Sequence, residues 1–390
     1  MTSSSVTRPG VEPGRTPSAP EPRSVSAAAA GSPGSVSGAP SASTGPSPAA
    51  STGPAASADL SPVAEADWDA AVAAIRAVAL DAEVQLICHV NPDGDALGSM
   101  LGFALGLRRL GFTRMRATFP GEFDVPEPYR ALPGSELLVP EPGAYAAPAL
   151  ILIFDVAAES RLGGLADRLD GDAPVVVLDH HASFTGFGDV SLVDPAAAAT
   201  SVVADELLTR LGVPLDAEIA ECLYVALTTD TGSFKFVRSP SVHSLAARLI
   251  ATGISPAEIA RRTFDTRPFG AMKLAGEVLG RAVLEPSAAG GRGLVWTYAT
   301  AADLERHGQR PYVLDALIDP VRGVAEADVA VVIKELTPGE WAVSLRSKGG
   351  SNVSAVAAAL GGGGHRLAAG FTGHGTPEDV IARIRPLLEA

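Results

Sequence analysis

Three short, mainly apolar runs constrain the fold of this chain more than any other feature of its sequence. They occupy residues 84–90, 149–154 and 174–178, and segments with helical spacing lie between and after them. So short an apolar run without alternation is typical of a strand that is buried on both faces of a parallel sheet. Because such strands alternate with helices, we expect an α/β fold whose first domain is built on a parallel sheet.

A second, smaller α/β domain is predicted from the strand-rich pattern near the C-terminus. The pattern divides the chain into a tail over residues 1–66, the parallel-sheet domain over 67–245, a helical linker over 246–285 and the second domain over 286–390. We expect a cleft between the two domains, because ligand sites commonly form where domains meet.

The tail differs from the rest of the chain in composition. Residues 1–62 consist mostly of Ser, Pro, Gly, Ala and Thr, and the first aromatic residue of the chain is Trp68. Such a segment has too little apolar surface to offset the entropy lost on ordering it. Its prolines would also break the amphipathic helix of a transit peptide. We therefore expect a disordered extension.

The acidic balance of the chain limits its partners. There are 30 Lys and Arg against 44 Asp and Glu, which gives a formal net charge of −14. Proteins that hold long nucleic acids by their phosphates are basic at least locally, so we expect no long nucleic acid as a partner.

No apolar run reaches the roughly 18 residues that a membrane span needs. Two cysteines cannot form a disulfide framework, which favours the reducing cytoplasm.

Acidic and histidine side chains follow the predicted strands at the points where the strands end. They are His89 at the end of the first run with Asp93 and Asp95 after it, Asp155 after the second run, Asp179, His180 and His181 after the third, and Asp230 at the end of a later helix. The carboxyl ends of parallel strands lie at one edge of the sheet, where ligands bind. We expect these side chains to meet there.

So many carboxylates in one cleft would repel each other unless cations compensated their charge. Mixed carboxylate and imidazole ligands suit Mn²⁺, Mg²⁺, Zn²⁺ or Fe²⁺. There are enough oxygen donors for two ions that share one carboxylate. Each segment alone has an ordinary explanation, since an Asp after a strand is often a helix N-cap and Asp93-Gly-Asp95 could be a simple turn. Their joint occurrence at successive strand ends favours a metal site.

These motifs, in this order and spacing, resemble the DHH phosphoesterase superfamily, named for the triplet Asp179-His180-His181. The stretch Gly361-Gly-Gly-Gly-His365-Arg-Leu-Ala-Ala-Gly370 is similar to the DHHA1 domain. The pair at this length resembles the bifunctional oligoribonucleases, or nanoRNases, that are also phosphatases of 3′-phosphoadenosine 5′-phosphate (pAp). The resemblance covers about residues 68–390.

The resemblance implies a site for two divalent metal ions, most often Mn²⁺, with Mg²⁺ as the alternative. One ion would be held by His89, Asp93 and Asp155, and the other by Asp95, Asp155, His180 and Asp230. Asp179 would orient the His180 ring, and His181 would face the scissile phosphate. One departure is Phe184, where the family often has Asn a few residues after the triplet.

The C-terminal motif predicts substrate contacts. Consecutive glycines let backbone N–H groups approach a phosphate closely, although four glycines alone could equally be a turn that closes a helix. Arg and His side chains donate to terminal phosphates or base edges. The expected substrate-binding residues are Arg346, Ser347, Gly363, Gly364 and His365.

The expected reaction is hydrolysis by a water that two metal ions activate. The substrates implied are short oligoribonucleotides, pAp, and linear or cyclic dinucleotides. The alternatives are an inorganic pyrophosphatase or exopolyphosphatase of the same superfamily, and a nucleotide sensor without catalysis. We leave open which substrate is preferred and whether the chain forms a homodimer.

Overall fold

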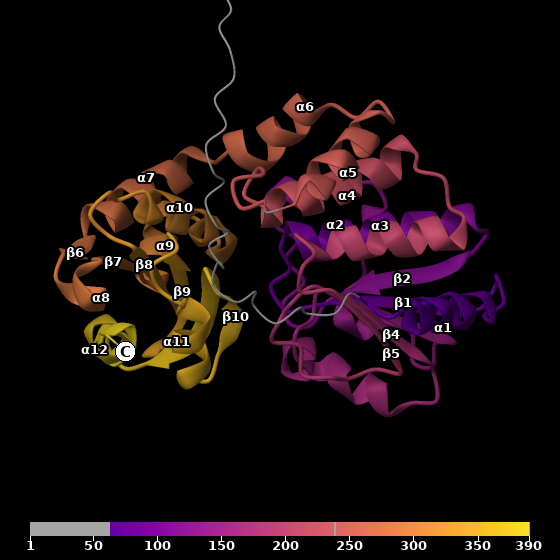
Figure 1. The fold of residues 1–390 in the computed structure, drawn as a ribbon, viewed down its shortest axis with the longest axis horizontal. Coiled ribbons are helices and arrows are strands. Elements are labelled where there is room, and N and C mark those ends of the chain that lie inside the picture. The colour runs from indigo at the N-terminus through magenta and orange to yellow at the C-terminus, as the bar shows by residue number, and fades with distance from the viewer. Residues whose placement is uncertain (1–62, 238, 390) are drawn as a thin grey trace, which may run out of the picture. The chain divides into compact units, whose positions relative to one another are not determined.

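The computed structural model describes residues 63–237 and 239–389 of the chain (Figure 1). Residues 1–62, which make up nearly all of the predicted tail, lie outside this range. Helix α1 (Glu65–Arg76) includes residues 65 and 66, the last two residues of the predicted tail. No helix within the described residues is both long enough and apolar enough to cross a bilayer.

The first domain is built on a parallel sheet of five strands, as the apolar runs predicted. Along the chain the strands are β1 (Glu83–Cys88), β2 (Arg114–Thr118), β3 (Leu150–Phe154), β4 (Val175–Asp179) and β5 (Val190–Val193). Their order in the sheet is β2-β1-β3-β4-β5, and every neighbouring pair is parallel. The three predicted strands therefore lie side by side at the centre, and the two strands that the sequence did not predict are at the edges.

Successive residues of the central strands are buried in two different cores, one on each face of the sheet. In β3, Leu152 packs into a core with the helices α2 (Gly94–Arg109), α3 (Thr200–Leu211) and α4 (Ala217–Asp230). Its neighbour Ile153 packs on the opposite face. Burial on both faces explains why these strands read as continuous apolar runs in the sequence.

Helix α2 packs so closely against α4 that only glycine fits between them. A Cβ on Gly98 would lie 2.4 Å from the carbonyl oxygen of Cys222 on α4. This close contact fixes α2 immediately after the polar loop that follows β1. The segment of helical spacing between the second and third predicted strands forms the 3₁₀ segment η4 (Glu159–Asp170), which Gly163 interrupts with a φ of +50°.

The second domain contains a mixed sheet of six strands in the order β10-β11-β9-β8-β7-β6. These strands are β6 (Val283–Glu285), β7 (Leu294–Ala299), β8 (Val329–Thr337), β9 (Glu340–Ser347), β10 (Gly363–His365) and β11 (Ala368–His374). Only β7 and β8 pair in parallel. The helices α11 (Val353–Ala359) and α12 (Pro377–Glu389) cover one face of this sheet.

The segment predicted as a linker is helical, and its residues join two different cores. In α5 (Pro240–Ile250), Leu249 packs into the core of the first domain, as does Ile259 of α6 (Pro256–Ala260). In α7 (Phe269–Gly280), Leu274 packs against the second sheet. The domain boundaries themselves remain a prediction.

Candidate metal and phosphate site

The loops after three neighbouring strands carry most of the predicted site. Strand β1 ends at Cys88, directly before His89, and β3 ends at Phe154, directly before Asp155. Cys88 pairs with Phe154 and Phe154 with Leu178, so the three strand ends are level. Parallel pairing therefore delivers the polar residues that follow β1, β3 and β4 to one edge of the sheet, as expected.

Asp155 lies at the centre of this group. Its carboxylate is 3.4 Å from Nε2 of His89, 3.6 Å from Nε2 of His180 and 3.6 Å from Nδ1 of His181. Burial alone would raise the pKa of this carboxyl, but the hydrogen bond from His89 and the charges of the histidines hold it well below its usual range. Asp155 adopts a φ of +60°, a backbone conformation that residues other than glycine rarely adopt.

The buried carboxylate of Asp95 is held by the start of helix α3. Oδ2 of Asp95 accepts a hydrogen bond of 2.7 Å from the backbone N–H of Thr200, and Oδ1 accepts one of 3.2 Å from that of Ser201. The hydroxyl of Ser99 donates to Oδ1 as well, at 2.9 Å. Burial and the nearby Asp155 nevertheless raise the pKa of Asp95 well above its usual value. An acidic group in this environment would gain from a cation beside it.

Asp93 has the cap role that we had considered as its ordinary explanation. Oδ1 of Asp93 accepts the backbone N–H groups of Asp95 and Ala96, both at 3.0 Å, and so caps helix α2. The side chain is exposed, and an oxygen of its carboxylate still comes within reach of His89 and Asp155. Capping a helix and facing a metal are therefore compatible here.

Two overlapping groups of side chains have the donors and spacing to hold a divalent cation. One is His89, Asp93 and Asp155, and the other is Asp95, Asp155 and His180, with the donor atoms of each group within 4.8 Å of one another. Asp155 belongs to both. Oδ2 of Asp230, the last residue of α4, lies 3.6 Å from Nε2 of His180 at the rim of the second group. Mixed carboxylate and imidazole donors fit a divalent first-row metal.

The carboxylate of Asp179 contacts a different histidine ring from the one expected. Its Oδ1 accepts a hydrogen bond of 2.7 Å from Nδ1 of His181, while the ring of His180 has its Nδ1 3.3 Å from the carbonyl oxygen of Ala197. Asp179 contacts His180 only through the backbone N–H, at 2.8 Å. Our expectation that Asp179 orients the His180 ring is therefore wrong, because the turn after β4 points the next ring at the carboxylate. Burial would lower the pKa of His181, but Asp179 and the surrounding carboxylates raise it to about 9.

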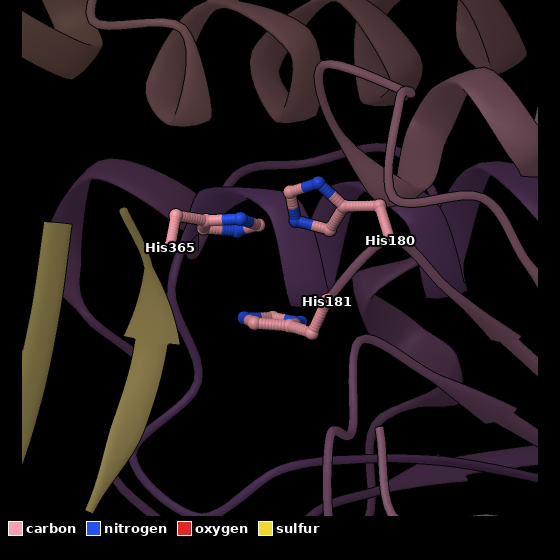
Figure 2. A group of neighbouring side chains, drawn as sticks. All are labelled: His180, His181 and His365. Carbon is pink, nitrogen blue, oxygen red and sulfur yellow. The ribbon is translucent and has the colours of Figure 1, made fainter. Parts of the chain in front are cut away.

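His365, at the end of β10, reaches the histidines of the first domain (Figure 2). Its ring centroid is 5.0 Å from that of His181, with the two rings nearly parallel, and 4.9 Å from that of His180. Nε2 of His365 is buried and has no hydrogen-bond partner among the described residues. Burial and the neighbouring histidines lower the pKa of His365 to about 4.

Arg346 and Ser347 are neighbours on β9, but only the first remains a candidate for substrate contacts. Burial lowers the pKa of Arg346, and the charge of Asp230 acts in the opposite direction, while its Nη1 donates to the carbonyl oxygen of Leu345 at 3.0 Å. Ser347 is fully buried, and its hydroxyl donates to Asp328 and accepts from the backbone of Gly349. Alternation along the strand turns the side chain of Ser347 inward, so its placement does not favour the predicted substrate role.

The four glycines have two separate roles. The N–H of Gly362 donates to the carbonyl oxygen of Ala357 at 2.8 Å, so Gly361 and Gly362 close helix α11, which was the alternative we considered. Gly363 and Gly364 instead belong to strand β10. Gly364 has a φ of +131°, and a Cβ there would lie 2.6 Å from the carbonyl oxygen of Ala368. Part of the glycine pattern thus serves the chain's own packing and part places His365.

Two residues at the site were missed by sequence reasoning. The hydroxyl of Thr200 donates to Oδ1 of Asp155 at 2.9 Å. Nη2 of Arg161, in η4, lies 2.9 Å from Nδ1 of His89. Neither residue stands in a motif. Thr200 is 45 residues from Asp155 along the chain and Arg161 is 72 residues from His89, so no spacing rule connects either pair. Phe184, which replaces the family's Asn, packs against Phe187 with ring centroids 5.0 Å apart.

Comparison with known proteins agrees with this geometry. Residues 83–227 match the DHH family, N-terminal domain, and residues 297–390 match the DHHA1 domain. The bifunctional oligoribonuclease and PAP phosphatase NrnA of Thermus thermophilus is 33% identical over 303 residues, which are 75% of this chain and 85% of the relative. The chain therefore belongs to the DHH family of phosphoesterases and is a hydrolase.

More distant relatives have the same organisation. The protein of Bacillus subtilis with the same name is 26% identical over 302 residues, covering 76% of this chain and 91% of the relative. A crystal structure of an exopolyphosphatase-related protein from Bacteroides fragilis superimposes with a TM-score of 0.72 at 22% identity, covering 84% of this chain and 99% of the other. That structure supports the fold alone.

Proposed function

We propose that this chain hydrolyses short oligoribonucleotides and pAp with the help of two divalent cations, Mn²⁺ in preference to Mg²⁺. One observation carries the proposal: Asp155 belongs to two adjacent donor groups at the ends of the central strands. His89, Asp93 and Asp155 would hold one ion, and Asp95, Asp155, His180 and Asp230 the other. When bound, such ions supply a hydroxide from water near neutral pH and neutralise charge on the phosphate oxygens.

The chain's own residues position the phosphate that is to be cleaved. His181 uses Nδ1 to bond Asp179, which leaves Nε2 as the ring atom available to a phosphate oxygen. Asp179 fixes the ring, since its Oδ1 accepts hydrogen bonds from Nδ1 of His181 and from the backbone N–H of His180. A histidine held in this way keeps one tautomer and one orientation.

Residues of the second domain complete the contacts to the substrate. His365 brings a buried ring nitrogen without a partner to the ring of His181, and Arg346 lies near the carboxylate of Asp230. A terminal phosphate or a base edge would satisfy both donors. The backbone of Gly363 and Gly364 would lie beside the substrate. Linear and cyclic dinucleotides belong to the same size class, and we include them as substrates.

A panel of substrates tests this function. The full chain with Mn²⁺ is assayed with a five-nucleotide RNA, pApA, pAp, cyclic di-AMP and inorganic pyrophosphate, with Asp155→Asn as the inactive variant. We expect turnover of the RNA and pAp and none of pyrophosphate. Faster hydrolysis of pyrophosphate than of every nucleotide would favour the pyrophosphatase alternative. Binding of all nucleotides without turnover of any would favour a sensor.

Cytoplasmic location and oligomeric state are further parts of the proposal. Cys88 and Cys222 are both buried and unpaired, as suits a reducing compartment. A homodimer remains a prediction, and light scattering of the purified chain would measure it directly.

A further inference from the structure

Three imidazoles, from His180, His181 and His365, form a cluster of nitrogen donors (Figure 2). His180 and His181 follow β4 and His365 ends β10, and one ring nitrogen of each lies within 4.8 Å of the others. The ring centroids are 4.8 to 5.0 Å apart. We call these three residues the histidine cluster. It contains no carboxylate, unlike both donor groups around Asp155.

The donor chemistry of the histidine cluster selects different metals from the acidic groups. Imidazole nitrogen suits Zn²⁺, Cu²⁺ and Ni²⁺, whereas Mg²⁺ and Mn²⁺ prefer carboxylate and water oxygens. Zinc also binds a given set of nitrogen donors more strongly than manganese does. A set of three nitrogens should therefore take Zn²⁺ under conditions in which the oxygen-rich groups hold Mn²⁺.

Two features of the cluster resemble a prepared ligand set. Asp179 accepts the Nδ1–H of His181 at 2.7 Å, so Nε2 is the nitrogen that can give up its proton and bind a metal, and this carboxylate–histidine arrangement is the one that commonly orients zinc ligands. The second feature is independent of the first. Nε2 of His365 is buried without a hydrogen-bond partner among the described residues, which is costly unless a ligand satisfies it.

We propose that His180, His181 and His365 form an inhibitory binding site for Zn²⁺. Zinc bonds to imidazole nitrogen are about 2.0–2.1 Å long, so tetrahedral coordination requires the nitrogens to close to roughly 3.4 Å, a movement of about 1 Å. No hydrogen bond from the described residues holds Nε2 of His365 in its present position. The inhibitory role, but not the binding itself, rests on the proposed function.

Inhibition follows from which residues the zinc would occupy. His181 and His365 are the groups that would otherwise contact the substrate phosphate. His180 belongs to both the histidine cluster and the group with Asp95 and Asp155, so a zinc ion in the cluster would compete with the neighbouring ion for the same ring. Zinc in the cluster therefore blocks the phosphate position and weakens the neighbouring Mn²⁺ site.

Direct metal binding tests the site without any turnover. The full chain is loaded with excess Mn²⁺, dialysed against micromolar Zn²⁺, and its zinc content is measured by mass spectrometry. We expect close to one zinc per chain in the wild type, and at least about 10-fold weaker binding in His365→Gln and in His181→Gln. The matched control is His374→Gln, an exposed histidine on β11 of the same sheet, which should bind as the wild type does.

Melting curves in EDTA establish that each variant is folded before its zinc content is compared. Equal zinc binding by the wild type and by both variants of the cluster would overturn the site. Zinc bound with the expected loss in the variants, but with no effect on hydrolysis of pAp, would overturn the inhibitory role alone. Because binding is measured without substrate, the first result does not depend on whether the proposed hydrolysis occurs, whereas the second requires that the zinc-free protein hydrolyses pAp.

Discussion

The hydroxyl of Thr200, the first residue of α3, donates a hydrogen bond of 2.9 Å to Oδ1 of Asp155, while its backbone N–H donates to Asp95. One residue therefore orients two of the carboxylates that face the proposed metals. Groups that hold metal ligands in place typically contribute 10–100-fold in affinity or activity. Thr200 is buried, so its hydroxyl has no role in contact with solvent.

Replacing Thr200 with valine should weaken metal binding while the chain stays folded. Valine preserves the shape of the side chain but removes the donor to Asp155. We expect Mn²⁺ affinity or kcat to fall by about 10–100-fold. Thr209→Val is the matched control, because Thr209 lies on the same helix and its hydroxyl bonds only a backbone carbonyl. Calorimetric titration with Mn²⁺ gives the answer, and an unchanged affinity in Thr200→Val would show that Asp155 needs no such support.

Substitutions of Asp155 and Asp179 should have different effects on metal content and on turnover. Asp155→Asn should lower the bound Mn²⁺ below two per chain and abolish turnover, because Asp155 belongs to both donor groups. Asp179→Asn should keep both ions and lose about 10–100-fold in kcat through the freed His181 ring. Metal content by mass spectrometry separates the two variants. If Asp155→Asn retained two ions and Asp179→Asn lost them, the roles assigned here would be reversed.

Arg161 should oppose metal binding at His89. Nδ1 of His89 lies 2.8 Å from the carbonyl oxygen of Val90 and 2.9 Å from the guanidinium of Arg161. The carbonyl favours a proton on Nδ1, which leaves Nε2 free to bind a metal, whereas the guanidinium favours the other tautomer and adds positive charge. We expect Arg161→Met to bind Mn²⁺ on the order of 10-fold more tightly. Arg161→Lys, which keeps the charge, should change less, and weaker binding in Arg161→Met would contradict this prediction.

A stability prediction concerns Asp303 of helix α9 (Ala301–His307). Burial would raise the pKa of this carboxyl, but hydrogen bonds from Arg281 and Thr300 lower it to about 2. Because the folded pKa lies below the unfolded one, the stabilisation is present above about pH 4 and is lost as the pH falls toward 2. Asp303→Asn should therefore be less stable at pH 7 by about 2 kcal/mol, and this difference should shrink as the pH falls from about 4 toward 2.

Urea unfolding of the chain in EDTA at several pH values measures this effect. Glu305→Gln, an exposed position on the same helix, is the control and should change the free energy of unfolding by less than about 0.5 kcal/mol. A difference between wild type and Asp303→Asn that is independent of pH would show that the ion pair with Arg281 does not set the pKa of Asp303.

The centre of the first sheet could be predicted from the sequence because burial on both faces leaves an unbroken apolar run. The edge strands β2 and β5 could not, since each is buried on one side only and β2 begins with two arginines in three residues. The same logic located the acidic and histidine residues at the sheet edge, because they follow the central strands directly. In the second domain, the short strand β10 is mostly glycine and has no strand signal of its own.

Contacts that depend on tertiary packing could not be predicted from the sequence. The ring that Asp179 contacts depends on the turn after β4, and the burial of Ser347 depends on the register of β9 with its neighbours. Thr200 and Arg161 approach the site from segments that carry no motif. Sequence therefore identified which residue types gather at the sheet edge, while their pairing follows from the fold.

The account's central claim is that this chain cleaves phosphoesters with two metal ions that share Asp155. The most direct measurement is the rate of pAp hydrolysis by the full chain before EDTA treatment, after dialysis against EDTA, and after titration with Mn²⁺. We predict that chelation abolishes turnover and that activity returns in full at two Mn²⁺ per chain. Undiminished hydrolysis in excess EDTA, or full recovery with a single ion, would contradict the claim.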